Sequence, residues 1–184
     1  VAQWLDNWYE SNYIKWAPTT QAIRKNAIEN RLKPMIGNYK LQKLDRATYQ
    51  RVFINKLIEK FKPNSVKTWH SIFRIAINAA VEDEILPRNR FVNVSIPDEE
   101  EIIRDNYLTE KELNILLDYA KEHESITNYS ALLVLAYTGM RKGELMGLHW
   151  KNIDFDKQTI TIEYTRDRNG IRKPKTNNSY RTIL

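Results

Sequence analysis

The segment 137–150, YTGMRKGELMGLHW, divides the sequence into two parts with different periodicity. Before this segment, apolar residues recur every three or four positions, which is typical of amphipathic helices. After it, between 153 and 164, apolar and polar residues alternate as in two antiparallel strands joined by a turn. Inside the segment, Gly139 allows a sharp backbone turn, and we predict a short helix from Arg141 to about Gly147. The sequence therefore predicts a mainly helical protein with a small antiparallel sheet after residue 150.

Arg141 and Glu144 are the residues of this segment that most suggest chemistry. They are three positions apart on a predicted helix, so the carboxylate can hold the guanidinium while the remaining N–H groups point outward. A guanidinium held in this way is suited to bind the paired oxygens of a phosphate group. The alternative interpretation is a surface ion pair that contributes little to stability.

A proline followed by four acids, at 97–101, marks a boundary between two predicted domains. We predict a helical domain over 1–97, a linker over 98–106 and a second domain over 107–184. The periodicity of apolar residues shows no internal repeat on either side of this boundary.

The first domain is predicted to contain four helices that pack around the last of them. The last helix begins at Asn64 and Ser65 and is apolar nearly all round, so it belongs at the centre of the bundle. Asp45 can cap the third helix, and Pro34 and Gly37 are expected to stop the second at about Leu32.

The second domain begins with Thr109 and Glu112, which have the spacing of a capping box and predict a helix. A strongly apolar helix is predicted over 129–137. The Asn-Gly pair at 169–170 predicts a turn, and residues 180–184 predict a further strand. These elements indicate an α+β domain.

Positive charge is concentrated in the first domain. The whole chain of 184 residues has a formal net charge of +6, but residues 1–97 carry 16 Lys and Arg against 8 Asp and Glu, while 98–184 carry 13 against 15. A basic domain attracts polyanions, of which nucleic acid is the commonest. The candidate phosphate contacts lie on the second helix and around the fourth: Arg24, Lys25, Arg31, Lys62, Lys67 and Arg74. The alternative for each of them singly is solvated surface charge.

The composition excludes several classes of protein. The chain has no cysteine, which removes disulfides, thiol nucleophiles and cysteine-ligated metals. No apolar run approaches the roughly 20 residues of a membrane-spanning helix, and the first residues do not form a signal peptide, so we expect a cytoplasmic protein with no membrane partner. Because the chain starts at Val1 and stops within a predicted strand, we expect it to be a piece of a longer protein.

The segment 137–145, followed by Leu148 and Trp150, resembles the first catalytic box of the tyrosine recombinases, the integrase family of phages and transposons. That box has the form TGxRxxEL, followed by a leucine and a tryptophan. Farther along the chain, KPKT at 173–176 and RTI at 181–183 resemble the hairpin segment of the family, in which the lysine before the threonine is catalytic.

Two upstream stretches, 32–44 and 68–81, resemble the helical core-binding domain of the same family. The resemblance thus covers nearly the whole chain and implies a four-helix SAM-like core-binding domain followed by a truncated α+β catalytic domain. The implied partners are double-stranded DNA attachment sites and other recombinase protomers in a synaptic tetramer. The implied location is the cytoplasm of a bacterium or phage-infected host, in association with the nucleoid.

The resemblance also implies a reaction that needs no metal or nucleotide cofactor. A tyrosine hydroxyl attacks the scissile phosphodiester, forms a 3′-phosphotyrosyl bond and frees a 5′-hydroxyl. By the same resemblance, Arg141 binds the non-bridging oxygens, Lys175 is the general acid toward the 5′ oxygen, and Glu144 orients Arg141.

The chain departs from the family pattern after Lys175. The family has a later His-x-x-Arg box, a further His or Trp and a late nucleophilic tyrosine, and none of these follows here. His149 does not fit the box, because Asn152 stands where the arginine should be. We assign none of the ten tyrosines as nucleophile and expect the chain to bind DNA without cutting it.

Two alternatives remain at this point. A non-catalytic DNA-binding or architectural protein would share the basic helical domain, yet would not need Arg141, Glu144 and Lys175. A type IB topoisomerase-like enzyme would use similar groups but relax supercoils rather than exchange DNA partners. A His-x-x-Arg box and a late tyrosine downstream of Leu184 would favour the recombinase.

Overall fold

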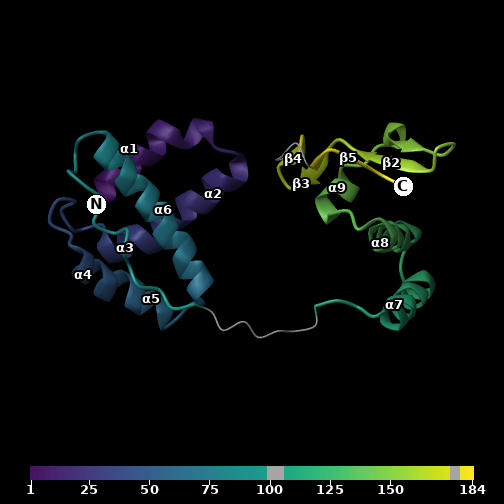
Figure 1. Cartoon of the computed structure of the whole chain (residues 1–184), viewed down its shortest axis with the longest axis horizontal. Coiled ribbons are helices and arrows are strands. Elements are labelled where there is room, and N and C mark those ends of the chain that lie inside the picture. Colours follow the sequence, from purple (N-terminus) through teal and green to yellow (C-terminus); the bar gives the residue numbers. More distant parts are fainter. Residues whose placement is uncertain (99–105, 175–178) are drawn as a thin grey trace. The chain divides into compact units, whose positions relative to one another are not determined.

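The computed structural model describes residues 1–98, 106–174 and 179–184. The chain forms two compact units, Val1–Ile103 and Arg104–Leu184 (Figure 1). The predicted linker over 98–106 lies outside the described residues except at its two ends. Among the described helices, none is long and apolar enough to cross a lipid bilayer.

The regular structure of the first unit is helical. Its elements are α1 (Ala2–Asn12), a 3-10 turn (Tyr13–Lys15), α2 (Pro18–Ala27), a π turn (Ile28–Leu32), α3 (Lys33–Ile36), α4 (Arg46–Tyr49), a second π turn (Gln50–Asn55), α5 (Lys56–Ile58) and α6 (Pro63–Glu82). The π turns join α2 to α3 and α4 to α5, so the described part of this unit has four helical rods. The predicted four-helix domain is confirmed.

One face of α6 supplies the centre of the core, as its apolar character predicts. Phe73, Ala76, Ile77 and Ala80 are all fully buried on this face. The ring of Tyr49 stacks on that of Phe73, with the centroids 4.8 Å apart. Figure 1 shows α6 crossing the middle of the unit, where the other rods can pack on it.

The prediction that the second helix stops at about Leu32 is wrong for Pro34, whereas Gly37 does cap the rod, which ends at Ile36. The rod continues through the π turn into α3, and Pro34 falls in the first turn of α3, where a missing N–H costs little. In an α-helix the carbonyl oxygen of Asn30 would accept a hydrogen bond from residue 34. Here that oxygen accepts one from the Arg31 guanidinium at 2.8 Å instead. The wider π turn therefore lets the helix pass the proline.

The third rod begins as predicted and then widens. The backbone N–H of Thr48 donates to the Asp45 carboxylate at 2.8 Å, which confirms the cap. The second π turn then brings Ile54 into the core beside Phe53, and both are fully buried. A strict α-helical spacing does not predict that Ile54 is buried. The π turn has more residues per turn than an α-helix, so the residues that face the core differ from those that an α-helical period selects.

The second unit has helices followed by short strands. Its elements are α7 (Glu110–His123), α8 (Ile126–Thr138), α9 (Lys142–Met146), a 3-10 turn (Trp150–Asn152), β1 (Ile153–Asp154), β2 (Thr159–Ile162), β3 (Thr165–Asp167), β4 (Gly170–Arg172) and β5 (Arg181–Ile183). The capping box of Thr109 and Glu112 is present at α7. Helix α8 begins earlier than predicted, because Ser125 caps it by accepting a hydrogen bond from the Asn128 N–H.

The described strands pair antiparallel, as predicted, but they form two small sheets rather than the single one expected. One sheet has the order β1-β2-β5, and β3 and β4 form a separate hairpin. In the first sheet Ile160 pairs with Ile183 and Ile162 pairs with Arg181. This register carries Arg181 back toward α9, although the two are far apart in sequence.

Helix α9 lies against β3 because Gly147 permits a close approach. A Cβ atom at this position would lie 2.9 Å from the carbonyl carbon and oxygen of Tyr164 and 3.0 Å from the Cα of Thr165. These are backbone atoms, which cannot rotate away as a side chain could. A larger residue must therefore push α9 off the hairpin.

We expect Gly147→Ala to lower the free energy of unfolding of the second unit by about 1–3 kcal/mol, because of this overpacking. Urea unfolding of the whole chain, followed by the amide NMR signals of β2 and β3, measures the change. Gly139→Asn is the control: Gly139 has a φ of 62°, which asparagine tolerates, and its Cβ would meet nothing within 4 Å. Equal stability of the two variants would contradict the close approach of α9 to β3.

Candidate functional site

Arg141 stands at the start of α9 because the chain reverses sharply just before it. Gly139 ends α8 in the left-handed conformation, with φ 62° and ψ 16°. The Thr138 hydroxyl donates to the Val134 carbonyl at 2.6 Å and accepts from the Met140 N–H at 3.3 Å. The turn predicted at Gly139 is therefore present, and it places Arg141 at the N-cap of α9.

The Glu144 carboxylate lies between two guanidinium groups. Oε2 accepts from the Arg141 backbone N–H at 2.9 Å and from Arg181 Nη2 at 2.8 Å. Oε1 accepts from Arg141 Nη1 at 3.0 Å and from Arg181 Nη1 at 3.1 Å. We call Arg141, Glu144 and Arg181 the Arg–Glu–Arg cluster. The predicted contact between Arg141 and Glu144 is present in it.

The three members of the cluster differ in exposure. The side chain of Glu144 is 4% exposed, that of Arg181 is 33% exposed and that of Arg141 is 74% exposed. Arg181 makes a two-pronged contact with the buried carboxylate, whereas Arg141 uses one side-chain nitrogen and presents the rest to solvent. The cluster has two positive charges and one negative charge, so its outer side is a fixed cationic group.

The contacts keep Glu144 ionised. Burial by itself raises the pKa of the Glu144 carboxyl, but the hydrogen bonds from Arg181 and Arg141 outweigh it and lower the pKa from 4.5 to about 2. The same contact raises the pKa of Arg181. At neutral pH the carboxylate is therefore charged and able to hold both arginines.

Arg181 is the member of the cluster that the sequence analysis did not assign to the site. Antiparallel pairing of β5 with β2 brings it to Glu144 from 37 positions away. One signal was available: in the strand predicted over 180–184, Arg181 and Ile183 are two positions apart and therefore share a face. A cation on the inward side of a strand implies a buried anion opposite it.

Lys175, the predicted general acid, lies outside the described residues, which resume at Ser179. His149 packs edge-on against Tyr164, with ring centroids 5.5 Å apart. Throughout the described ranges, no group of three His, Asp or Glu side chains could hold a metal ion.

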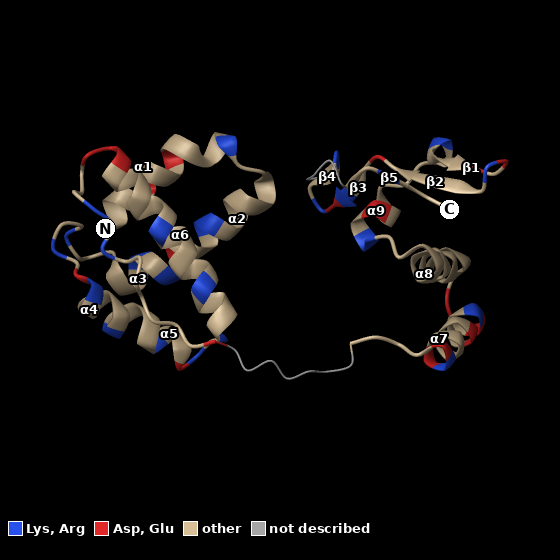
Figure 2. Ribbon diagram, viewed as in Figure 1, with Lys and Arg blue, Asp and Glu red and all other residues tan. Residues whose placement is uncertain are grey.

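In the first unit, two of the six predicted phosphate contacts border a groove between α2 and α6. The groove has a volume of about 610 Å³, and Arg24 of α2 and Lys67 of α6 line it from opposite sides. Figure 2 shows Lys and Arg on both of these helices. The Arg24 guanidinium stacks over the Trp16 ring at 4.0 Å, and Lys67 Nζ lies 2.6 Å from an exposed Asp98 carboxylate oxygen.

The remaining groove residues are small polar and aliphatic side chains, which suit close contact with a sugar–phosphate backbone. They are Thr20, Ile23, Asn64, Thr68, Ser71, Ile72 and Ile75. Lys62 is exposed just before α6, and Arg74 is exposed on the same helix.

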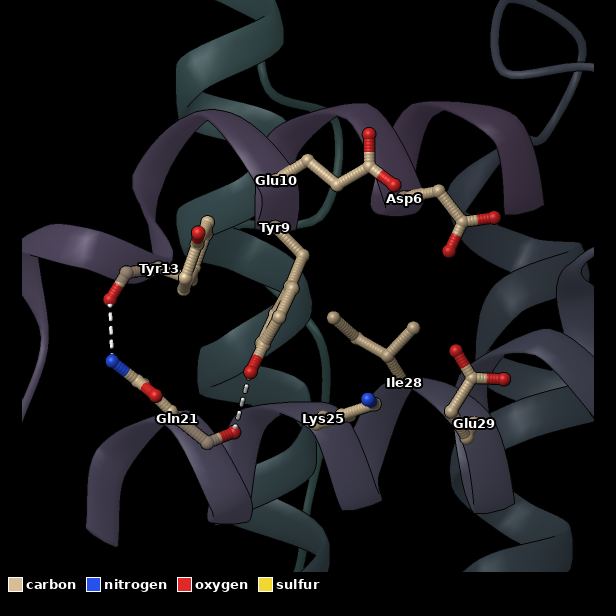
Figure 3. Close-up of a pocket in the computed structure, with 8 residues that line it drawn as sticks. All are labelled: Asp6, Tyr9, Glu10, Tyr13, Gln21, Lys25, Ile28 and Glu29. Atoms are coloured by element: carbon tan, nitrogen blue, oxygen red, sulfur yellow. Dashed lines mark hydrogen bonds between the residues drawn. The ribbon is translucent and has the colours of Figure 1, made fainter. Parts of the chain in front are cut away.

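Lys25 and Arg31 lie away from this groove. Lys25 lines a pocket of about 490 Å³ between α1 and α2, where Asp6, Glu10 and Glu29 are the charged neighbours (Figure 3). The Arg31 guanidinium lies over the Phe61 ring at 4.8 Å and over the Trp69 ring at 5.0 Å. The structure thus brings Arg24 and Lys67 together and separates Lys25 and Arg31 from them.

Each of the two units matches a known protein family. Residues 1–58 match the phage integrase N-terminal SAM-like domain, and residues 106–183 match the phage integrase family. The integrase of Staphylococcus phage L54a is 31% identical over 183 residues, with 89% of this chain and 51% of that protein covered. A tyrosine recombinase XerC-like protein of Caldanaerobacter subterraneus is 29% identical, with 71% and 38% covered. The chain therefore spans about half the length of these relatives or less.

Solved structures share the fold. The Tn1549 transposon integrase in complex with a circular intermediate DNA has a TM-score of 0.80 at 17% identity, with 98% of this chain and 60% of that chain covered. A lambda integrase tetramer bound to a Holliday junction has a TM-score of 0.74 at 18% identity, with 93% and 49% covered. A SAM-like helical unit joined to an α+β unit is thus the integrase fold. The chain belongs to the phage integrase family of tyrosine recombinases.

Proposed function

We propose that this chain is the DNA-binding part and the first catalytic part of a site-specific recombinase, which cuts and rejoins DNA through a 3′-phosphotyrosyl intermediate. The observation that carries the proposal is the Arg–Glu–Arg cluster, in which a buried carboxylate fixes the exposed Arg141 guanidinium. Membership in the tyrosine recombinases supports the same reaction class.

In this reaction the residues have distinct tasks. Arg141 binds the non-bridging oxygens of the scissile phosphate and balances the charge that builds on the pentacovalent phosphorus. Lys175 protonates the 5′ oxygen as it leaves. Glu144 orients Arg141, and Arg181 holds Glu144 from the opposite side. Because no tyrosine of this chain is assigned as nucleophile, the chain by itself binds DNA without cutting it.

The proposed partners are double-stranded DNA attachment sites and other protomers of the recombinase. The solved relatives bound to a circular intermediate DNA and to a Holliday junction support both partners. A purely architectural DNA-binding protein would have no use for a buried carboxylate that fixes an exposed arginine, so the cluster favours the recombinase.

We expect the chain to bind duplex DNA with an affinity that falls steeply as the salt concentration rises, because each phosphate contact releases counterions. In the variant Lys67→Gln/Arg74→Gln, the slope of log K against log salt should be smaller by about 2, since two phosphate contacts are removed. Fluorescence anisotropy on a labelled duplex over a salt series measures both quantities.

The matched control is Arg51→Gln/Lys56→Gln, which removes two charges from exposed positions outside the α2–α6 groove. It should leave the slope nearly unchanged. Duplex binding that is indifferent to ionic strength would overturn the proposed DNA contact by the first unit.

A further inference from the structure

A basic pocket lies in the first unit, apart from the α2–α6 groove, and is formed by α4 and the loop that follows α6. It has a volume of about 420 Å³ and is lined by Arg46, Arg88, Asn89, Arg90, Val92 and Asn93. The lining contains three arginines and no acid. The acid next to Arg46 in sequence, Asp45, is engaged in capping α4 through Thr48. The sequence analysis assigned no role to these arginines.

The loop that carries Arg88 and Arg90 is held in place. Asn89 Nδ2 donates to Asn78 Oδ1 at 2.6 Å and to the Arg74 carbonyl at 3.3 Å. The Asn89 side-chain oxygen accepts from the Phe91 N–H at 2.9 Å, and Phe91 is 1% exposed in the core. A rigid loop loses little conformational entropy when a ligand binds to it, so the pocket is preorganised.

The three arginines of the pocket differ in whether their guanidinium groups are already hydrogen-bonded. Arg90 Nη1 donates to the Gln42 carbonyl at 2.8 Å, which ties this side chain to the segment before α4. Arg46 and Arg88 are exposed, and within the described chain neither forms an ion pair. Their guanidinium groups are therefore available to an anion, and the planar fork of each suits a phosphate.

A polar face of α6 connects this pocket to the α2–α6 groove. Lys67, Ser71, Arg74 and Asn78 recur at intervals of four, three and four residues, which places them on one side of the helix. Lys67 and Ser71 line the groove, and the Arg74 side chain is exposed next to it. The Asn78 side chain and the backbone carbonyl of Arg74 accept hydrogen bonds from Asn89 of the pocket. At roughly 1.5 Å per residue, this face extends for about 16 Å.

We propose that the pocket of Arg46, Arg88 and Arg90 binds a backbone phosphate of the same DNA duplex that contacts the α2–α6 groove. This inference rests on the proposed function. The face of α6 that joins the two sites is about 16 Å long, which is comparable to the roughly 12 Å width of the major groove, so one duplex can offer a phosphate to each site. Arg46 and Arg88 contact the phosphate, and Arg90 and Asn89 hold the loop.

The test compares three double variants of the whole chain by anisotropy on one labelled duplex over a salt series. They are Arg46→Gln/Arg88→Gln for the pocket, Lys67→Gln/Arg74→Gln for the groove and the face of α6 next to it (the groove variant), and Arg51→Gln/Lys56→Gln as the charge-matched control. The groove variant keeps the backbone contact of Arg74 with Asn89. Arg90 is left intact because of its bond to Gln42. The pocket variant should lower the salt slope by about 2 and the affinity near 0.1 M salt by about tenfold or more.

The outcomes separate the two proposals. A reduced slope for the pocket variant with an unchanged control supports the inference. Salt-dependent binding that only the groove variant weakens overturns the inference and leaves the proposed function standing. An equal reduction of slope and affinity in the control variant also overturns the inference, because the net charge of the chain would then account for the effect. Absence of salt-dependent duplex binding by the unmodified chain overturns both.

Discussion

Glu144→Gln is expected to lower the free energy of unfolding of the second unit by about 3 kcal/mol at pH 7. The carboxylate is 4% exposed and accepts hydrogen bonds from two guanidinium groups. Its pKa is about 2, against an ordinary 4.5, and a difference of this size corresponds to about 3 kcal/mol. A neutral amide keeps the shape of the side chain but leaves Arg181 without a charged partner.

The pH dependence identifies the carboxylate as the source of this stability. Because the pKa is lower in the folded state than in the unfolded state, the contribution is complete above about pH 5.5 and is lost as the pH falls toward 2. The difference in stability between the wild type and Glu144→Gln should therefore be constant from pH 7 to about 5.5 and fall to roughly half by about pH 3. Other acids titrate equally in both proteins and cancel.

Urea unfolding followed by the amide NMR signals of the second unit measures this difference. Glu163→Gln is the matched control, because Glu163 is in the same unit, is 40% exposed and, among the described residues, contacts no arginine: it accepts a hydrogen bond from Asn152, which an amide oxygen can still accept, and forms a 3.5 Å ion pair with Lys151. It should change stability little. If the stability difference between the wild type and Glu144→Gln stayed the same down to pH 3, packing rather than the charged contact would account for that difference.

The elements that the sequence predicts well are those fixed by local signals. Asp45 and Thr109 cap their helices through bonds to residues three positions later, so the spacing alone is enough. The two π turns depend instead on tertiary packing: one accommodates Pro34 and the other buries Ile54. An α-helical period cannot reveal either of them, because the extra residue in each turn is selected by what the helix packs against.

The candidate site also combines contacts that local spacing predicts with contacts that depend on the tertiary fold. Arg141 and Glu144 are three positions apart, and their contact follows from helix geometry. Arg181 reaches the same carboxylate only through the register of β5 on β2, which the sequence does not specify. Arg24 and Lys25 are neighbours in sequence, but a step of about 100° around α2 directs one to the groove and the other to an acidic pocket.

In the complete recombinase that we propose, Arg141→Ala should reduce strand cleavage by at least about 100-fold while duplex binding persists. The reason is that removal of one preorganised donor to a developing oxyanion costs about 10²–10³ in rate. Arg141 is 74% exposed and belongs to the second unit, so its loss leaves the α2–α6 groove intact. Cleavage of a suicide substrate, with binding to the same duplex measured in parallel, separates the two effects.

Lys175→Ala should also abolish cleavage, but for a different reason, and the leaving group distinguishes the two roles. A substrate with sulfur in place of the 5′ bridging oxygen expels a thiolate, whose conjugate acid has a pKa of about 8.5 and needs no proton donor. This substrate should restore cleavage by Lys175→Ala and leave Arg141→Ala inactive, because charge on the non-bridging oxygens must still be balanced. Rescue of both variants, or of Arg141→Ala alone, would contradict the assigned roles, since only a general acid becomes dispensable when the leaving group improves.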